Sequence, residues 1–183
     1  SNITIEGTAC PLYIRLANRA RKHVATAPEP PMGAMRNISI NNLVAYGTGN
    51  YCSSITAIPG YYIEDLSLSN IQLYNAGGLA PENYFMKTED VEEDEKGYPQ
   101  PKVWGKGLPS SGLFIRHVKN MQVNGLMLGS QKMDPRVPVI ADDVDGLQIK
   151  NIMKVYNSGA DSFFKGKNAR NISIDKPLGW ERD

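Results

Sequence analysis

Short runs of alternating apolar and polar residues recur along the whole chain, and most of them end at a turn-forming residue. Five runs share a phrase in which two apolar positions are separated by one polar position. The phrases begin at Asn37, Asp65, Asn120, Gly146 and Asn171. Alternation over a few residues is typical of half-buried strands, and almost no stretch shows a helical period. The pattern therefore predicts an all-β chain.

The five phrases are regularly spaced. Between their first apolar residues the steps are 28 residues (38 to 66), 55 (66 to 121), 26 (121 to 147) and 25 (147 to 172). The longest step is about double the others because it contains a long polar insertion. A fixed period of this size indicates a repeat architecture.

Each repeat has room for two or three strands, too few for a propeller blade, and it lacks the leucine ladder and helix of a leucine-rich repeat. Such strands, with Asn at the turns, favour a parallel β-helix of about five or six coils, in which equivalent strands stack about 4.8 Å apart. We expect one domain over residues 1–183, and a β-sandwich is the alternative. Alternation predicts ten inward-facing side chains: Ile38, Ile40, Leu66, Leu68, Met121, Val123, Leu147, Ile149, Ile172 and Ile174. A turn ladder is expected from Asn41, Asn70, Asn124 and Asn151.

Two loop insertions interrupt the repeats, near 19–35 and 77–109. Loops of this length in a domain are usually functional or disordered. A basic cluster, from Arg15 to Lys22, opens the first. It could bind an acidic ligand, because the planar fork of arginine matches a carboxylate, or it could be an ordinary solvated face. The second contains six acids between 89 and 95, which we expect to form a mobile, solvated loop or to pair with the basic segment.

Composition narrows the function classes. The 183 residues are 41% hydrophobic and carry a formal net charge of +1, which gives enough material for a core and no support for nucleic-acid binding. No apolar stretch approaches the length of a membrane span. Cys10 and Cys52 are not spaced as a metal pair, so they are either two buried thiols or a disulfide between coils. No metal or cofactor is expected.

Several phrases together resemble glycoside hydrolase family 28, the polygalacturonase and rhamnogalacturonase family. They are Pro-Leu-Tyr-Ile-Arg-Leu-Ala-Asn-Arg at 11–19, Arg-Asn-Ile-Ser-Ile-Asn-Asn at 36–42, and Ile-Pro-Gly-Tyr followed by Ile-Glu-Asp-Leu at 58–66. The segment from 111 to 144 is similar to the carboxyl-terminal coils of bacterial members that act on pectins. The resemblance implies a right-handed parallel β-helix and a periplasmic or secreted protein, although the chain shows no signal peptide.

The resemblance covers only the carboxyl-terminal part of that family. The Asn-Thr-Asp and Gly-His-Gly phrases that accompany its catalytic aspartates are absent, so no catalytic residue is predicted. Asp142 and Asp143 are adjacent and would point to opposite faces of a strand, which favours a turn or surface role. His117 has no evident acidic partner in the sequence, and a structural or surface role is expected for it too.

The sequence therefore suggests the carboxyl-terminal β-helix part of a pectin-directed glycoside hydrolase, inactive by itself. The alternative is a non-enzymatic β-helix module that binds acidic polysaccharide or assembles with a partner. A pectate lyase is a weaker reading, because no calcium-binding acid cluster is evident. The family's Arg-x-Lys carboxylate motif falls at Arg15 with its Lys missing. The predicted substrate-binding residues are Arg15, Arg19, Arg21, Tyr98 and Trp104. An open first coil near Ile3 and Ile5 predicts self-association.

Overall fold

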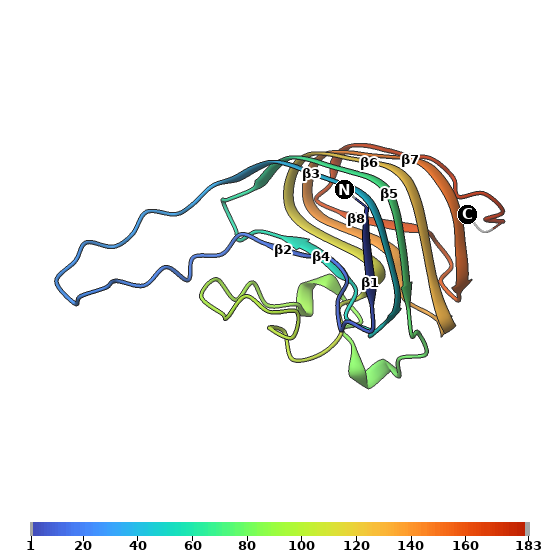
Figure 1. Ribbon diagram of the computed structural model, residues 1–183, viewed down its shortest axis with the longest axis horizontal. Helices are drawn as coiled ribbons and strands as arrows, with labels where there is room; N and C mark the ends of the chain where they lie inside the picture. The colour runs from blue at the N-terminus through green and yellow to red at the C-terminus, as the bar shows by residue number, and fades with distance from the viewer. Residues whose placement is uncertain (1, 182–183) are drawn as a thin grey trace.

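The structure is a computed structural model and describes residues 2–181. Its regular structure is almost entirely strand, with two short 3-10 turns (Figure 1). The strands are β1 (Ile3–Glu6), β2 (Tyr13–Arg15), β3 (Met35–Thr48), β4 (Ser53–Thr56), β5 (Ile63–Asn75), β6 (Ser110–Asp134), β7 (Val137–Ser158), β8 (Phe164–Lys167) and β9 (Arg170–Ile174). The 3-10 turns are η1 (Pro81–Asn83) and η2 (Thr88–Asp90). No helix in the described part is long and apolar enough to cross a membrane.

All strand pairs are parallel and form three ladders along the bent strands. The first ladder contains β2, β4, the beginnings of β6 and β7, and β8. The second contains the beginnings of β3 and β5, the middles of β6 and β7, and β9. The third contains β1 and the ends of β3, β5, β6 and β7. The all-β class and the parallel sheet are thus confirmed, and the sheet is not closed.

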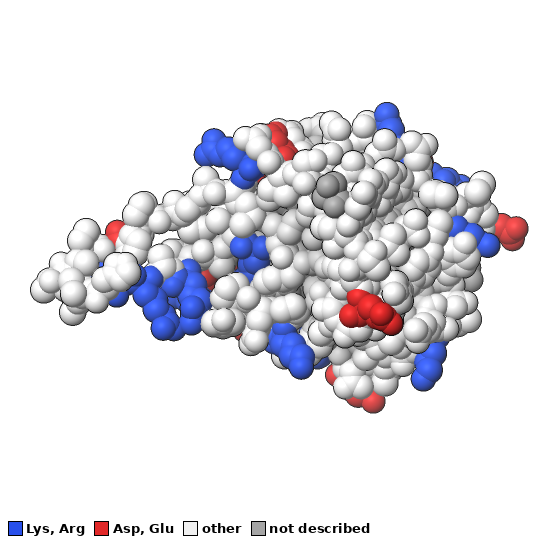
Figure 2. Space-filling model, in the orientation of Figure 1, with Lys and Arg blue, Asp and Glu red and all other residues white. Residues whose placement is uncertain are grey.

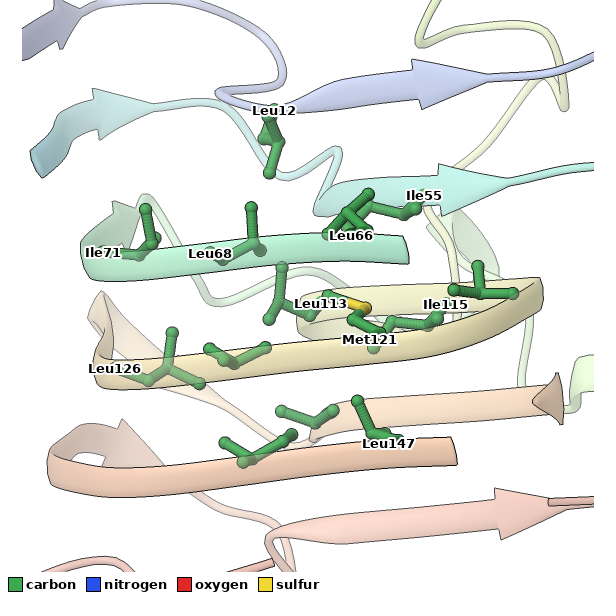
Figure 3. Packing of buried hydrophobic residues seen from close by; sticks show 14 of the residues in the cluster. Leu12, Ile55, Leu66, Leu68, Ile71, Leu113, Ile115, Met121, Leu126 and Leu147 are labelled. Carbon is green, nitrogen blue, oxygen red and sulfur yellow. The ribbon is translucent and has the colours of Figure 1, made fainter. Parts of the chain in front are cut away.

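The register reproduces the spacing of the repeated phrases. Ile38 pairs with Leu66, Leu66 with Met121, Met121 with Leu147, and Leu147 with Ile172. The predicted alternation is confirmed, because these side chains belong to the core or pack against it. A fully buried Leu, Ile or Met side chain contributes about 1.5–3 kcal/mol. Stacked apolar rows, seen in Figure 3, therefore supply the main driving force for the sheet.

The strands bend where residues adopt positive φ, and these residues form rows across the sheet. One row consists of Asn37, Asp65, Asn120, Gly146 and Asn171, and another of Asn2, Asn42, Asn70, Gly125 and Asn151. Asn, Asp and Gly tolerate the left-handed region better than other residues. The predicted ladder is one position off at two places, because Asn41 pairs with Ser69 and Asn124 with Lys150.

Two long segments leave the sheet. The first, residues 16–34 between β2 and β3, is called the excursion here, and it projects far from the strands (Figure 1). The second, residues 76–109 between β5 and β6, is called the insertion, and it carries both 3-10 turns. Four of the six acids between 89 and 95 are exposed, as expected of a solvated loop, but the insertion as a whole also packs on the sheet. Its Val91 and Leu108 form a second apolar cluster with Cys52, Phe114 and Ile140, and so cover one side of the first ladder.

The two cysteines are buried neighbours but not a disulfide. The Cys10 thiol lies 3.2 Å from the carbonyl oxygen of Cys52 and 3.3 Å from that of Leu12. Burial raises the pKa of Cys10 to about 11 and raises that of Cys52 further. Both thiols are therefore protonated and act as small packing groups.

Candidate functional site

A row of mostly polar and charged residues runs across the strands of the first ladder. The row takes one residue from each of β2, β4, β6, β7 and β8, and each residue pairs with the next: Arg15, Thr56, Arg116, Asp142 and Lys167. They alternate with inward-facing residues such as Ile55 and Ile115, so the row lies on the side covered by the insertion. The two arginines connect the insertion to the sheet.

Arg116 is 3% exposed and is surrounded by acceptors. Its Nε lies 2.9 Å from Asp142 Oδ2, while Nη1 and Nη2 donate to the carbonyl oxygens of Val91 (2.9 Å) and Thr88 (2.7 Å). Glu93 Oε1 lies 3.4 Å from the same guanidinium. A buried charge of this kind is tolerated only when it is paired and hydrogen-bonded. Arg116 therefore holds the acidic stretch of the insertion against the sheet.

Arg15 has a similar role. Its Nη2 donates to the carbonyl oxygens of Glu93 (2.7 Å) and Asp94 (2.8 Å), and Nη1 donates to Thr56 Oγ1 at 3.1 Å. The guanidinium also lies 5.2 Å from the ring centroid of Trp104. The Trp104 indole N–H donates to Glu92 O at 2.9 Å. Arg15 Nη2 and the Trp104 indole N–H, both on predicted ligand-binding residues, thus donate to backbone carbonyls of the insertion.

His117, next along β6, bridges the insertion and β7. Its Nε2 lies 3.2 Å from Glu93 Oε2, and its Nδ1 lies 2.7 Å from Asp143 Oδ2. The Tyr62 hydroxyl donates to the same Asp143 oxygen at 2.9 Å. His117 and Asp143 both have positive φ and form a third row of bent positions. The structural role expected for His117 holds, but its two acidic partners correct the view that it has none.

Charge and burial shift the pKa values of this cluster in opposite directions. Burial by itself would lower the pKa of His117, but the hydrogen bonds and charges of Glu93 and Asp143 outweigh it and raise the pKa. Burial would likewise raise the carboxyl pKa values of Glu93 and Asp143, but contact with His117 and nearby cations lowers both. The cluster therefore favours an imidazolium between two carboxylates.

A cleft of about 430 Å³ lies between the excursion and the insertion. It is lined by Asn18, Arg19, Ala20, Arg21, Glu29, Pro30 and Lys96. Three of these are cations and one is an anion, and the single carboxylate, on Glu29, already pairs with Lys22 at 2.7 Å. Figure 2 shows Lys and Arg side chains gathered along the lower border of the excursion in that view. The cleft therefore presents net positive charge to a ligand.

Of the five predicted binding residues, two line this cleft and a third contacts one of them. Arg19 and Arg21 line it. The ring of Tyr98, which is 61% exposed, lies beside Arg19, with its centroid 4.7 Å from the Arg19 guanidinium. No ion pair to Arg19, Arg21 or Lys96 occurs among the described residues. Their charges are therefore free to meet a ligand.

Asp142 and Asp143 are both engaged in contacts with neighbouring side chains. Asp142 pairs with Arg116, and Asp143 accepts hydrogen bonds from His117 and Tyr62. Asp143 occupies a bend, as the turn role predicted, whereas Asp142 is buried within β7, so the turn or surface role expected for it is wrong. No group of three or more His, Cys, Asp or Glu side chains within residues 2–181 is arranged to hold a metal ion.

Sequence reasoning missed Lys96, Glu93 and the partners of His117. The partner on β7 had a signal, because the steps from 116 to 142 and from 117 to 143 are both 26, the same as the step from Met121 to Leu147. Glu93 and Lys96 had no such signal in the sequence, because their positions depend on how the insertion folds back onto the sheet.

The chain matches no protein-family model, no curated protein and no solved structure.

Proposed function

We propose that this protein binds an acidic, pectin-like polysaccharide in the cleft between the excursion and the insertion. In this proposal it is the carboxyl-terminal part of a polygalacturonase-like glycoside hydrolase of the periplasm or the extracellular space. The observation that carries the proposal is a cleft with three cations, none in an ion pair within the described residues, beside an exposed tyrosine ring.

The chemistry of a uronate chain fits these groups. Each sugar carries one carboxylate, for which an arginine fork offers bidentate hydrogen bonds. The sugar ring has an apolar face that can lie against an aromatic ring such as that of Tyr98. Because Arg15 donates to the protein, we assign carboxylate recognition to Arg19 and Arg21, with Lys96 as an additional cation.

We further propose that the bent parallel sheet is a right-handed β-helix of about five or six coils. Three parallel ladders joined by rows of left-handed Asn, Asp and Gly residues support this reading. Each apolar row would take one strand from every coil, as the stacking of repeats in such a solenoid requires. The described edge strand β1 is the surface at which we propose self-association.

The alternative is a binding module that belongs to no enzyme. The pairing of Asp142 with Arg116 and of Asp143 with His117 supports the view that neither carboxylate hydrolyses a glycosidic bond. Both proposals predict a chain that is inactive alone. They differ in what happens when a chain with the family's catalytic aspartates is added, since only the enzyme part would complete an active site.

The test is calorimetric titration with galacturonate oligomers. We expect Arg19→Ala and Arg21→Ala each to weaken binding about 2- to 5-fold, the effect of losing one exposed charge pair. Binding should weaken further as salt rises from about 0.05 M to about 0.3 M. Lys150→Ala is the matched control, because Lys150 is an exposed cation of β7 outside the cleft.

Equal affinity for neutral and acidic oligomers would contradict the proposal, as would an equal loss with Lys150→Ala. A hydrolysis assay on polygalacturonate with the same purified protein completes the test. Robust turnover that disappears in Asp142→Asn or Asp143→Asn would overturn the structural roles assigned to this pair.

A further inference from the structure

We infer that His117 is a positioning residue for the cleft, and that its protonated ring clasps the insertion to the sheet so that ligand binding depends on pH. This inference rests on the proposed function, which names the cleft as the ligand site. His117 itself does not line the cleft. It would act through Glu93, the acidic residue of the insertion that it contacts.

The geometry requires the charged form of the imidazole. Both ring nitrogens face carboxylate oxygens, Nδ1 at 2.7 Å from Asp143 and Nε2 at 3.2 Å from Glu93. A neutral imidazole has one N–H and one lone pair, so one of its nitrogens would face a carboxylate with no proton between them. Only the imidazolium donates to both partners. Loss of its proton therefore breaks one of the two contacts and replaces it by repulsion between lone pairs.

The other polar and charged side chains near His117 also contact neighbouring side chains. The Tyr62 ring packs against it edge-on at 6.1 Å and donates its hydroxyl hydrogen to Asp143. Lys119 lies over Tyr62, and Arg170 pairs with Asp145. The charged and titratable groups around the cluster are Arg15, Tyr62, Glu93, Arg116, Lys119, Asp142, Asp143, Asp145 and Arg170.

A continuous set of contacts joins His117 to the cleft. Beyond the Glu93 side chain, the carbonyl oxygens of Glu93 and Asp94 accept from Arg15. The next residue, Glu95, accepts a backbone hydrogen bond from the N–H of Asn18 at 2.9 Å. Asn18 and Lys96 both line the cleft. Four consecutive residues of the insertion thus connect the clasp to the cleft wall, and freeing Glu93 would loosen Lys96 relative to Arg19.

The sign of the pH dependence follows from the raised pKa of His117. The clasp is fully formed below the ordinary histidine value of about 6.5 and is lost as the pH rises through the raised value. The lowered pKa values of Glu93 and Asp143 mean that their contribution is lost only at acidic pH, as they become protonated. Between about pH 6 and pH 8.5 a uronate carboxylate, arginine and lysine keep their charges. A change of affinity in that window would therefore report on a histidine or on the α-amino group, and the histidine variants separate the two.

The experiment compares binding of tri-galacturonate at about pH 6 and about pH 8.5. We expect the affinity of the unmodified protein to fall about fivefold or more, the size of a modest coupling between sites. His117→Gln should remove the pH dependence. Glu93→Gln should remove it as well, because an amide can donate to a neutral ring nitrogen and so keeps the contact at high pH.

His23→Gln is the matched control, because His23 is the only other histidine and lies exposed on the excursion. It should keep the pH dependence. Amide hydrogen exchange of residues 92–96 is measured at the same two pH values, without ligand and corrected for intrinsic rates. Faster exchange at high pH in the unmodified protein, but not in Glu93→Gln, is the expected result.

The two readouts separate the possible failures. No binding at either pH, with pH-dependent exchange, would refute the proposed function but leave the clasp intact. Binding and exchange that are both independent of pH would overturn the clasp alone, as would a pH dependence lost in His23→Gln. Exchange that depends on pH while affinity does not would refute the coupling between the clasp and the cleft.

Discussion

Replacing Arg116 by Met would remove the charge that ties the insertion to the sheet, while leaving a side chain of similar length to fill the space. Arg116 is 3% exposed, and its partner Asp142 is buried too. The substitution would leave the Asp142 carboxylate without its cation and the carbonyl oxygens of Thr88 and Val91 without their donors. Three buried acceptors would then lack a partner.

The expected cost is about 3–5 kcal/mol, because breaking a buried ion pair on one side leaves an uncompensated charge. That is a large part of a typical folding free energy of about 5–15 kcal/mol. Removing both charges should cost less. In Arg116→Met with Asp142→Leu the desolvation penalty disappears with the carboxylate, and we expect recovery of about half the loss or more.

Urea unfolding followed by circular dichroism measures these free energies, and limited proteolysis of the insertion shows whether it has left the sheet. Arg170→Met is the matched control, because the Arg170–Asp145 pair has a similar length, 3.0 Å, but the Arg170 side chain is 72% exposed. Its loss should change the free energy of unfolding far less than the loss of Arg116, because water screens an exposed ion pair. Equal effects of the two substitutions, or a double variant as unstable as the sum of its parts, would refute the reasoning.

Two further predictions concern the sheet. Asn70 has a φ of 53°. Asn70→Ala should lower the stability of the protein by about 1–2 kcal/mol and Asn70→Gly by much less, because only glycine takes a left-handed conformation without a steric penalty. Thermal unfolding measures both losses, and equal losses would speak against the prediction. Ile3 is 40% exposed on the edge strand β1, so Ile3→Lys should shift the chain toward monomer in light scattering at high concentration. A clean monomer before the substitution would contradict the second prediction.

The strand rows could be predicted from the sequence because their cause is local. Alternation fixes which side chains of a phrase face inward, and a constant step fixes which phrases stack. Ile38, Leu66 and Met121 therefore lie beside one another as their spacing indicated. The turn ladder was predicted one position off at Asn41 and Asn124, because a run of polar residues does not reveal which of them takes the left-handed conformation.

The site was less predictable because it depends on contacts between segments without a repeat. Arg19, Arg21 and Tyr98 were expected at a ligand site; the two arginines line one cleft, and the Tyr98 ring lies against Arg19. Arg15 and Trp104 were expected there too, but Arg15 donates to the insertion and Trp104 donates to a carbonyl oxygen within it. A charged residue in a long loop has many candidate partners, and only the folded path of the insertion selects among them.

The way the insertion joins the sheet allows the outer part of the insertion to vary in length. Its first residue, Ala76, still lies in the ladder, accepting from Lys132 N–H and donating to Thr48 O. Asn75 Nδ2 also donates to Ser111 O at 2.7 Å, so the chain leaves and re-enters the sheet at almost the same point. The mostly exposed stretch 98–102, which lies outside the contacts made by Arg15 and Arg116, can therefore be lengthened or shortened while the apolar rows stay in register. Such changes would alter the surface around Tyr98 and leave the contacts that hold the insertion on the sheet in place.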